Sequence, residues 1–153
     1  MEKTKLNLPL PLPLYRGIVA EGEHAGEMIE GSVLITIVGD YEDISIMPPE
    51  MEKLGETIRP ETLCMYIGKE DMNGKSIFTG YVLKYEFEDN GEKYAEYFIP
   101  YWEQKICGFM LHSSQSDLPV DIDGDISEFE IIGNIHENPE LLKLFPHLQG
   151  VKA

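Results

Sequence analysis

The acidic segment Asp121-Ile-Asp-Gly-Asp125 is the part of the chain that comes closest to a metal site. Carboxylates at alternate positions are the oxygen ligands of a calcium loop. A loop of the EF-hand type also needs Gly at its sixth position and Glu at its twelfth, where this sequence has Ile126 and Ile132. We therefore predict no metal ion, and we interpret Asp121, Asp123 and Asp125 as an acidic turn available for contact with a partner.

Cysteine and histidine are the side chains that could supply a nucleophile and its base. Cys107 and His112 are five residues apart, which places them on opposite faces of a strand, and no neighbouring residue would orient the histidine. Cys64 and Cys107 also lack the spacing of a zinc site. We expect buried free thiols, and the sequence leaves a disulfide between the two open. We predict no catalytic residue, no cofactor and no enzymatic activity.

Five aromatic residues between Tyr94 and Trp102 could form a stacking platform for single-stranded nucleic acid. Such platforms carry basic residues, whereas here glutamates offset the neighbouring lysines. In a strand, these aromatic side chains would alternate between both faces. That pattern is typical of a strand buried on both sides, and we favour this interpretation over an exposed binding groove.

The charge balance restricts the classes of partner. The 153 residues include 28 acidic and 12 basic side chains, for a formal net charge of −16. Neither nucleic acid nor an anionic membrane is an expected partner of such a surface. Two interpretations remain, a well-solvated surface or an acidic mimic of DNA. Three prolines break the N-terminal apolar run and no run reaches the length of a transmembrane helix, so we expect a cytoplasmic protein.

The elements that must position these residues begin with an N-terminal segment that alternates leucine with proline. Prolines occupy positions 9, 11 and 13, and in a strand they remove N–H donors along one edge only. We interpret residues 1–14 as an extended arm that pairs with a sheet edge, in its own chain or in a neighbour's, through Leu8, Leu10, Leu12 and Leu14. The alternative is an unpaired polyproline-like leader.

Residues 15–153 predict one mainly antiparallel β domain. Fourteen Gly and ten Pro are many for this length and are typical of a turn-rich sheet protein. Strands are expected at 27–38, 43–47, 63–67, 76–78, 81–88, 93–102, 106–112 and 129–135. Asn73-Gly74 and Asn90-Gly91 supply the positive φ of tight hairpin turns, and a two-residue loop at the second would pair Phe87 with Tyr94.

The C-terminal region predicts a short helix after the last strand. Asn138 is a good N-cap and Pro139 a good first helical residue. Leu141 and Phe145 are four residues apart, so they would dock on the domain from one face of this helix. Pro146 ends it.

Several of these segments occur in the order found in a known family. They are Tyr15-Arg-Gly17, Gly26 to Ile35, Pro60-Glu61-Thr62 with Tyr66-Ile-Gly68, Asp71-Met-Asn-Gly-Lys-Ser-Ile-Phe78, and Phe129 to Leu142. Together they resemble the YopX family of phage and prophage proteins. One departure is Thr79-Gly80-Tyr81, where the family usually has Glu-Gly-Asp. His136 stands where the family usually has tyrosine, which favours a packing role.

The resemblance implies a small SH3-like barrel within a mostly β architecture and an origin in a phage or an integrated prophage, hence the cytoplasm of a bacterial host. It implies no substrate, cofactor or catalytic residue. The positions expected to hold the fold together are Tyr66, Gly68, Asn73, Gly74, Gly133, Asn134, Asn138 and Pro139.

Three functions are therefore considered. The leading hypothesis is a non-enzymatic accessory protein that binds an unknown protein partner, with a homo-oligomer formed through the N-terminal arm as one form of that binding. The second is an acidic DNA mimic that inhibits a host DNA-binding protein. The third is an enzyme whose site is assembled from scattered residues.

Overall fold

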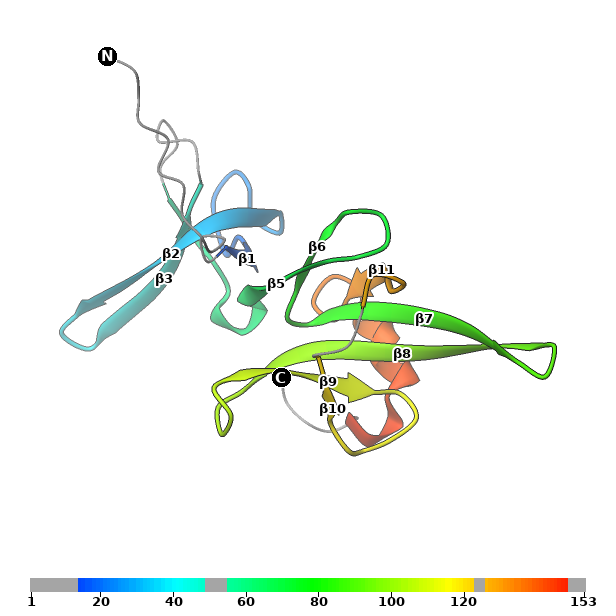
Figure 1. The fold of residues 1–153 in the computed structure, drawn as a ribbon. Helices are drawn as coiled ribbons and strands as arrows, with labels where there is room; N and C mark the ends of the chain where they lie inside the picture. Colours follow the sequence, from blue (N-terminus) through cyan, green and yellow to red (C-terminus); the bar gives the residue numbers. More distant parts are fainter. Residues whose placement is uncertain (1–13, 49–54, 123–125, 149–153) are drawn as a thin grey trace, which may run out of the picture.

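The computed structural model describes residues 14–48, 55–122 and 126–148, and short alternating segments within them form two antiparallel sheets (Figure 1). The first sheet has the strand order β4-β3-β2-β1-β5-β6. Its strands are β1 (Tyr15–Ile18), β2 (Met28–Val38), β3 (Tyr41–Met47), β4 (Glu56–Thr57), β5 (Cys64–Glu70) and β6 (Ser76–Phe78).

The second sheet has the strand order β10-β9-β8-β7-β11. Its strands are β7 (Tyr81–Asp89), β8 (Glu92–Glu103), β9 (Gly108–Ser113), β10 (Val120–Asp121) and β11 (Glu130–Asn134). Three short 3-10 helices complete the described chain: η1 (Pro60–Thr62), η2 (Pro139–Leu144) and η3 (Pro146–Leu148). None of the described residues forms a helix long and apolar enough to cross a membrane.

The predicted antiparallel β class is confirmed, whereas the SH3-like barrel is not. Within the described ranges the first sheet ends at β4 and β6, and the second ends at β10 and β11. The chain leaves the first sheet at Phe78 and turns at Gly80, whose φ is +79°, directly into β7 of the second sheet. Because a barrel requires a sheet that returns to its own first strand, this departure leaves two open sheets.

The predicted C-terminal helix is of the 3-10 type, and the side chain of Asn138 does not cap it. The Oδ1 atom of Asn138 instead accepts a hydrogen bond from the backbone N–H of Asn134, at 3.3 Å. Pro139 does begin η2, as its fixed φ favours. Phe145, which follows η2, is fully buried beside Val82 and Ile99.

The β7–β8 hairpin has the predicted register. Asn90 and Gly91 form its turn with φ of 52° and 81°, and Phe87 lies opposite Tyr94. Two successive positive φ values match the right-handed twist of the flanking strands. Local turn chemistry therefore sets this pairing.

The aromatic segment of β8 is buried at its centre and exposed at its ends. Phe98 packs on Phe129 and Leu83 in one core cluster, and Ile99 is buried on the opposite face. The prediction of a strand buried on both sides is right for this central part. It is wrong for Tyr94 and Trp102, which are 44% and 42% exposed.

The β2–β3 hairpin, residues 32–47, extends away from the rest of the molecule (Figure 1). Its base is buried at Ile46, and its outer part exposes large apolar side chains. These side chains are Leu34, Ile35, Ile37, Val38 and Tyr41. The sequence predicted the strands but gave no sign that their apolar residues would face solvent.

Candidate functional site

Asp71 joins two of the motif segments, which are far apart in sequence. Its Oδ1 atom accepts hydrogen bonds from the backbone N–H groups of Asn73 and Lys75, both at 2.9 Å, and its Oδ2 atom accepts one from Ile131 at 3.0 Å. The backbone N–H of Met72 also donates to the carbonyl of Phe129, at 2.8 Å. The turn after β5 is thereby fixed to β11.

The electrostatics of Asp71 follow from these bonds. Its side chain is almost fully buried, which by itself raises the pKa of the carboxyl group. The three backbone donors outweigh burial, so the pKa lies below its ordinary value and the carboxylate is charged at neutral pH. Asp71 is a structural anion, and both of its carboxylate oxygens accept hydrogen bonds from its own chain.

Asn134 organises the second motif in the same way. Its Oδ1 atom accepts hydrogen bonds from the N–H groups of His136 (3.0 Å) and Glu137 (2.9 Å), and its Nδ2 donates to the Glu137 carboxylate (2.6 Å). A Cβ atom on Gly133 would lie 2.6 Å from Oδ1 of Asn138, so only glycine fits there. We call Asp71, Asn134 and these hydrogen-bond partners the motif junction.

Arg16 links the N-terminal motif to the β6–β7 region. Its Nε donates to the Glu30 carboxylate at 2.7 Å, one guanidinium nitrogen donates to the Tyr81 hydroxyl at 2.5 Å, and the guanidinium lies 4.6 Å from the centre of the Phe78 ring. Burial lowers the pKa of Arg16, but the bonds to Glu30 and Tyr81 more than compensate and raise it. A polar cavity of about 340 Å³ lies between Arg16 and Asn134.

The remaining predicted motif positions also serve the fold. Tyr66 packs on Phe78 with ring centres 5.7 Å apart, and Gly68 has a φ of +82° within the irregular part of the β5–β6 pairing. Gly74 has a φ of +75° at the following turn, next to Asn73. These residues therefore shape strands and turns.

The predicted interaction residues are only partly described. Leu14 precedes β1, and its carbonyl accepts a hydrogen bond from Tyr66 at 2.9 Å. Its side chain packs on the Cys64, Phe78 and Tyr81 cluster. The other predicted arm residues, Leu8, Leu10 and Leu12, lie outside the described residues.

Asp121 is exposed in the edge strand β10, whereas Asp123 and Asp125 lie outside the described residues. In the part of the chain that the structure describes, no group of three His, Cys, Asp or Glu side chains could hold a metal ion.

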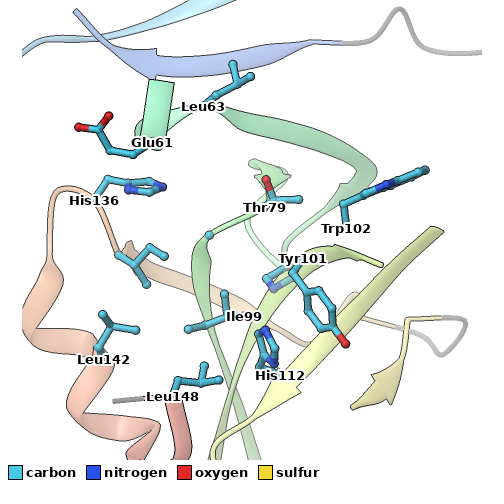
Figure 2. A pocket seen from close by; sticks show the side chains of 13 residues that line it. Glu61, Leu63, Thr79, Ile99, Tyr101, Trp102, His112, His136, Leu142 and Leu148 are labelled. Atoms are coloured by element: carbon cyan, nitrogen blue, oxygen red, sulfur yellow. The ribbon is translucent and has the colours of Figure 1, made fainter. Parts of the chain in front are cut away.

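An apolar cleft of about 310 Å³ lies where η1 and the β6–β7 turn meet the second sheet (Figure 2). Figure 2 shows Tyr101 and His112 on one wall and Leu142 and Leu148 on the other. Its lining comes from distant segments: Glu61, Leu63, Thr79, Gly80, Ile99, Pro100, Tyr101, Trp102, His112, Ile135, His136, Leu142 and Leu148. Most of these side chains are apolar, so the cleft suits an apolar group.

Aromatic contacts hold one wall of the cleft. The rings of Tyr101 and His112 stack at 4.0 Å between centres and 12° between planes, across neighbouring strands β8 and β9. Trp102 meets Phe109 edge to face, with ring centres 5.2 Å apart. This wall is preorganised, because each ring is held by its neighbour across the sheet.

The two histidines of the cleft are predominantly neutral. Burial lowers the pKa of His112, and His147 lowers it further. Burial also lowers the pKa of His136, a shift that Glu61 and Glu137 oppose. The Nε2 atom of His136 would lie 3.4 Å from a Cβ built on Gly80, so the ring covers this glycine. Neutral imidazoles can donate or accept a hydrogen bond without adding charge to the cleft.

Both cysteines lie outside this cleft lining and are free. Burial raises the pKa of the Cys64 thiol to about 12, so it is protonated at neutral pH and is a poor nucleophile. Cys107 is exposed in the β8–β9 turn, so the expectation of a buried thiol is wrong there. His112 instead faces the cleft beside Tyr101.

Sequence reasoning missed both Asp71 and the cleft. A signal for Asp71 was present, since an aspartate two residues before Asn-Gly commonly accepts backbone N–H groups of its own turn. The cleft had no comparable signal, because Leu63, Gly80 and Leu142 come from separate elements and converge only in the folded chain.

The fold and motif junction define a two-sheet antiparallel β protein held by buried polar turns. The chain belongs to the YopX family, because the family model described as YopX protein matches residues 23–143. The crystal structure of protein EF1440 from Enterococcus faecalis is similar, with 20% sequence identity and a TM-score of 0.47 over 86% of this chain and 98% of that chain. No curated protein matches this chain significantly.

Proposed function

We propose that this YopX protein is a non-enzymatic accessory protein of a phage or prophage, located in the host cytoplasm, and that its cleft binds an apolar side chain of a protein partner. The observation that carries the proposal is the preformed cleft with stacked aromatic rings on its wall. Its volume lies at the small end of ligand sites, a size suited to one anchoring side chain rather than a large cofactor.

The residue types around the cleft support protein binding. Tryptophan and tyrosine are enriched among the residues that dominate binding at protein interfaces. Tyr101 and Trp102 both line the cleft, and Trp102 is exposed. The net charge of −16 favours a partner with a positively charged surface around its apolar anchor. Glu61 lines the cleft next to His136 in Figure 2, and its carboxylate would pair with such a charge.

The test begins with affinity capture from a lysogenic host and continues with calorimetric titration of the purified partner. Trp102→Ala removes an exposed ring at the cleft, and we expect about a 30-fold weaker affinity. Tyr94→Ala is the matched control, because Tyr94 lies on the same strand, is equally exposed and does not line the cleft. We expect it to bind as the unchanged protein does.

Two outcomes would oppose the proposal. If Trp102→Ala and the unchanged protein bind the partner with equal affinity, the cleft is not part of the interface. Displacement of the partner by duplex DNA, with no dependence on Trp102, would identify the acidic DNA mimic instead.

A further inference from the structure

The outer edge of β2 has no partner strand beyond Gly31 among the described residues. β1 pairs with β2 from Met28 to Gly31, whereas the rest of β2 has only β3 beside it. Val19 donates its N–H to the carbonyl of Glu27 at 2.9 Å, so odd-numbered residues of β2 turn their backbone groups toward this edge. Because the backbone groups of a strand face its two edges alternately, those of Val33, Ile35 and Ile37 also face this edge.

The same residues form an aliphatic stripe. Directly opposed residues of an antiparallel pair share one face, so Val33 and Ile35 lie beside Ile46 and Ile44 of β3, and Ile37 lies beside Glu42 near the tip of the hairpin. Ile46 is fully buried, whereas Ile35 and Ile37 are 60% and 64% exposed. The stripe therefore runs from the core into solvent along the open edge.

This edge lacks the features that keep natural edge strands apart. Between Gly31 and Gly39 the sequence is Ser-Val-Leu-Ile-Thr-Ile-Val, with no charged residue and no proline. Natural edges usually carry lysine, proline or a bulge. In a chain with a net charge of −16, an uncharged edge allows two copies to meet without placing like charges opposite each other.

The sequence of the N-terminal arm is poorly suited to pairing with this edge. Tyr15 lies opposite Gly31, so continuing β1 in the same register would place residues 13 to 8 opposite residues 33 to 38. The carbonyl of Leu14 faces β5, where it accepts a bond from Tyr66, so residues 13, 11 and 9 would face β2. All three are prolines and have no N–H to donate.

We propose that the open edge of β2 binds a second copy of itself, antiparallel and across a two-fold axis at Ile35. In this register Ile35 lies opposite Ile35 of the second copy, and Val33 lies opposite its Ile37. All the outward-facing backbone groups of Val33, Ile35 and Ile37 then pair, and the two hairpins form one sheet in the order β3-β2-β2-β3. This surface is separate from the cleft, so it does not depend on the proposed function.

The test is the mass of the full chain in solution, measured by sedimentation over a range of concentrations. We expect twice the 17.4 kDa of one chain for the unchanged protein. Ile35→Lys and Ile35→Glu each place like charges face to face, and we expect a dimer dissociation constant about 100-fold higher for each. An equimolar mixture of the two variants should restore the dimer, because opposite charges then meet at the axis.

The controls separate this pairing from other modes of association. Ile106→Lys changes an isoleucine of similar exposure in the β8–β9 turn and should leave the dimer intact. Deleting residues 1–13 should also leave it intact. The proposal is overturned if the unchanged protein is monomeric, if both Ile35 variants remain dimeric, if their mixture does not recover, or if deletion of the arm alone removes the dimer.

Discussion

The motif junction and the β2–β3 hairpin use polar and apolar side chains in opposite ways. At the junction, polar groups such as Asp71 and Asn134 are buried and bonded to the chain itself. On the hairpin, aliphatic groups such as Ile35 and Ile37 are left in water. Buried polar groups must find partners within the fold, whereas exposed apolar groups gain by finding partners outside it. The polar groups of the motif junction are therefore occupied by the fold, and binding is expected at exposed apolar surfaces.

Among the substitutions that test this contrast, Gly133→Ala is expected to change the free energy of unfolding most. A Cβ atom there would lie 2.6 Å from Oδ1 of Asn138 and 2.8 Å from Cδ1 of Leu141. We expect a loss of about 3 kcal/mol in the free energy of unfolding, measured by urea denaturation. Gly108→Ala, where the nearest atom is at 3.6 Å, is the control and should change little.

Asp71→Asn should be the next most damaging change. The amide has one acceptor oxygen in place of two and turns an NH₂ group toward a backbone donor, so we expect a loss of about 2–3 kcal/mol. Because the pKa of Asp71 is lowered on folding, its contribution is present above about pH 4 and disappears as the pH falls through the folded value. The difference between the two proteins should therefore shrink in acid.

Denaturation at several pH values measures this difference. Asp117→Asn, at an exposed position, should follow the unchanged protein throughout. A constant difference between Asp71→Asn and the unchanged protein down to pH 2 would contradict a role for the charged carboxylate.

Arg16→Lys tests the half-buried cation that links β1 to Tyr81 and Phe78. Lysine keeps the charge but cannot bond Glu30 and Tyr81 together while stacking on Phe78. We expect a loss of about 1–2 kcal/mol in unfolding experiments. Arg59→Lys, at an exposed position, should be neutral. Equal effects at the two positions would show that charge alone matters.

The cleft should respond to mild acid. The pKa values of His112 and His136 are lowered on folding, so the unfolded chain binds more protons as the pH falls below about 6.5. The stability that the two neutral histidines contribute is fully present above that pH. It is lost as the pH falls toward their pKa values in the folded protein. We expect the melting temperature to fall between pH 7.5 and 5.5, and less steeply in the double variant His112→Gln, His136→Gln. An unchanged slope would assign the pH dependence to other groups.

The smallest effect on folding is expected on the hairpin. Leu34→Ser removes an exposed side chain, so the free energy of unfolding of the dilute monomer should change by less than about 0.5 kcal/mol. Denaturation at low protein concentration measures this. A loss comparable to that of Asp71→Asn would show that the hairpin is part of the core and would remove the contrast.

Local chemistry made part of the fold predictable. The Asn90-Gly91 turn fixed the β7–β8 register because both residues adopt the positive φ that the turn needs. The SH3-like barrel, which rested on the family resemblance, is not confirmed, and the turn residues around Gly80 gave no indication of which sheet the next strand joins. The bond from Ile131 to Asp71 and the lining of the cleft could not be predicted, because Ile131 and Leu142 are brought to these places only by the complete fold.

The bond from Ile131 to Asp71 spans 60 residues, and this separation has a consequence for biosynthesis. Asp71 leaves the ribosome first and must remain solvated until β11 has been translated and has docked beside β7. Contacts between such distant residues form late, because a long loop must close before they contribute. We therefore expect the nascent chain to acquire its β7–β8 hairpin early and its final rigidity only when the last strand arrives.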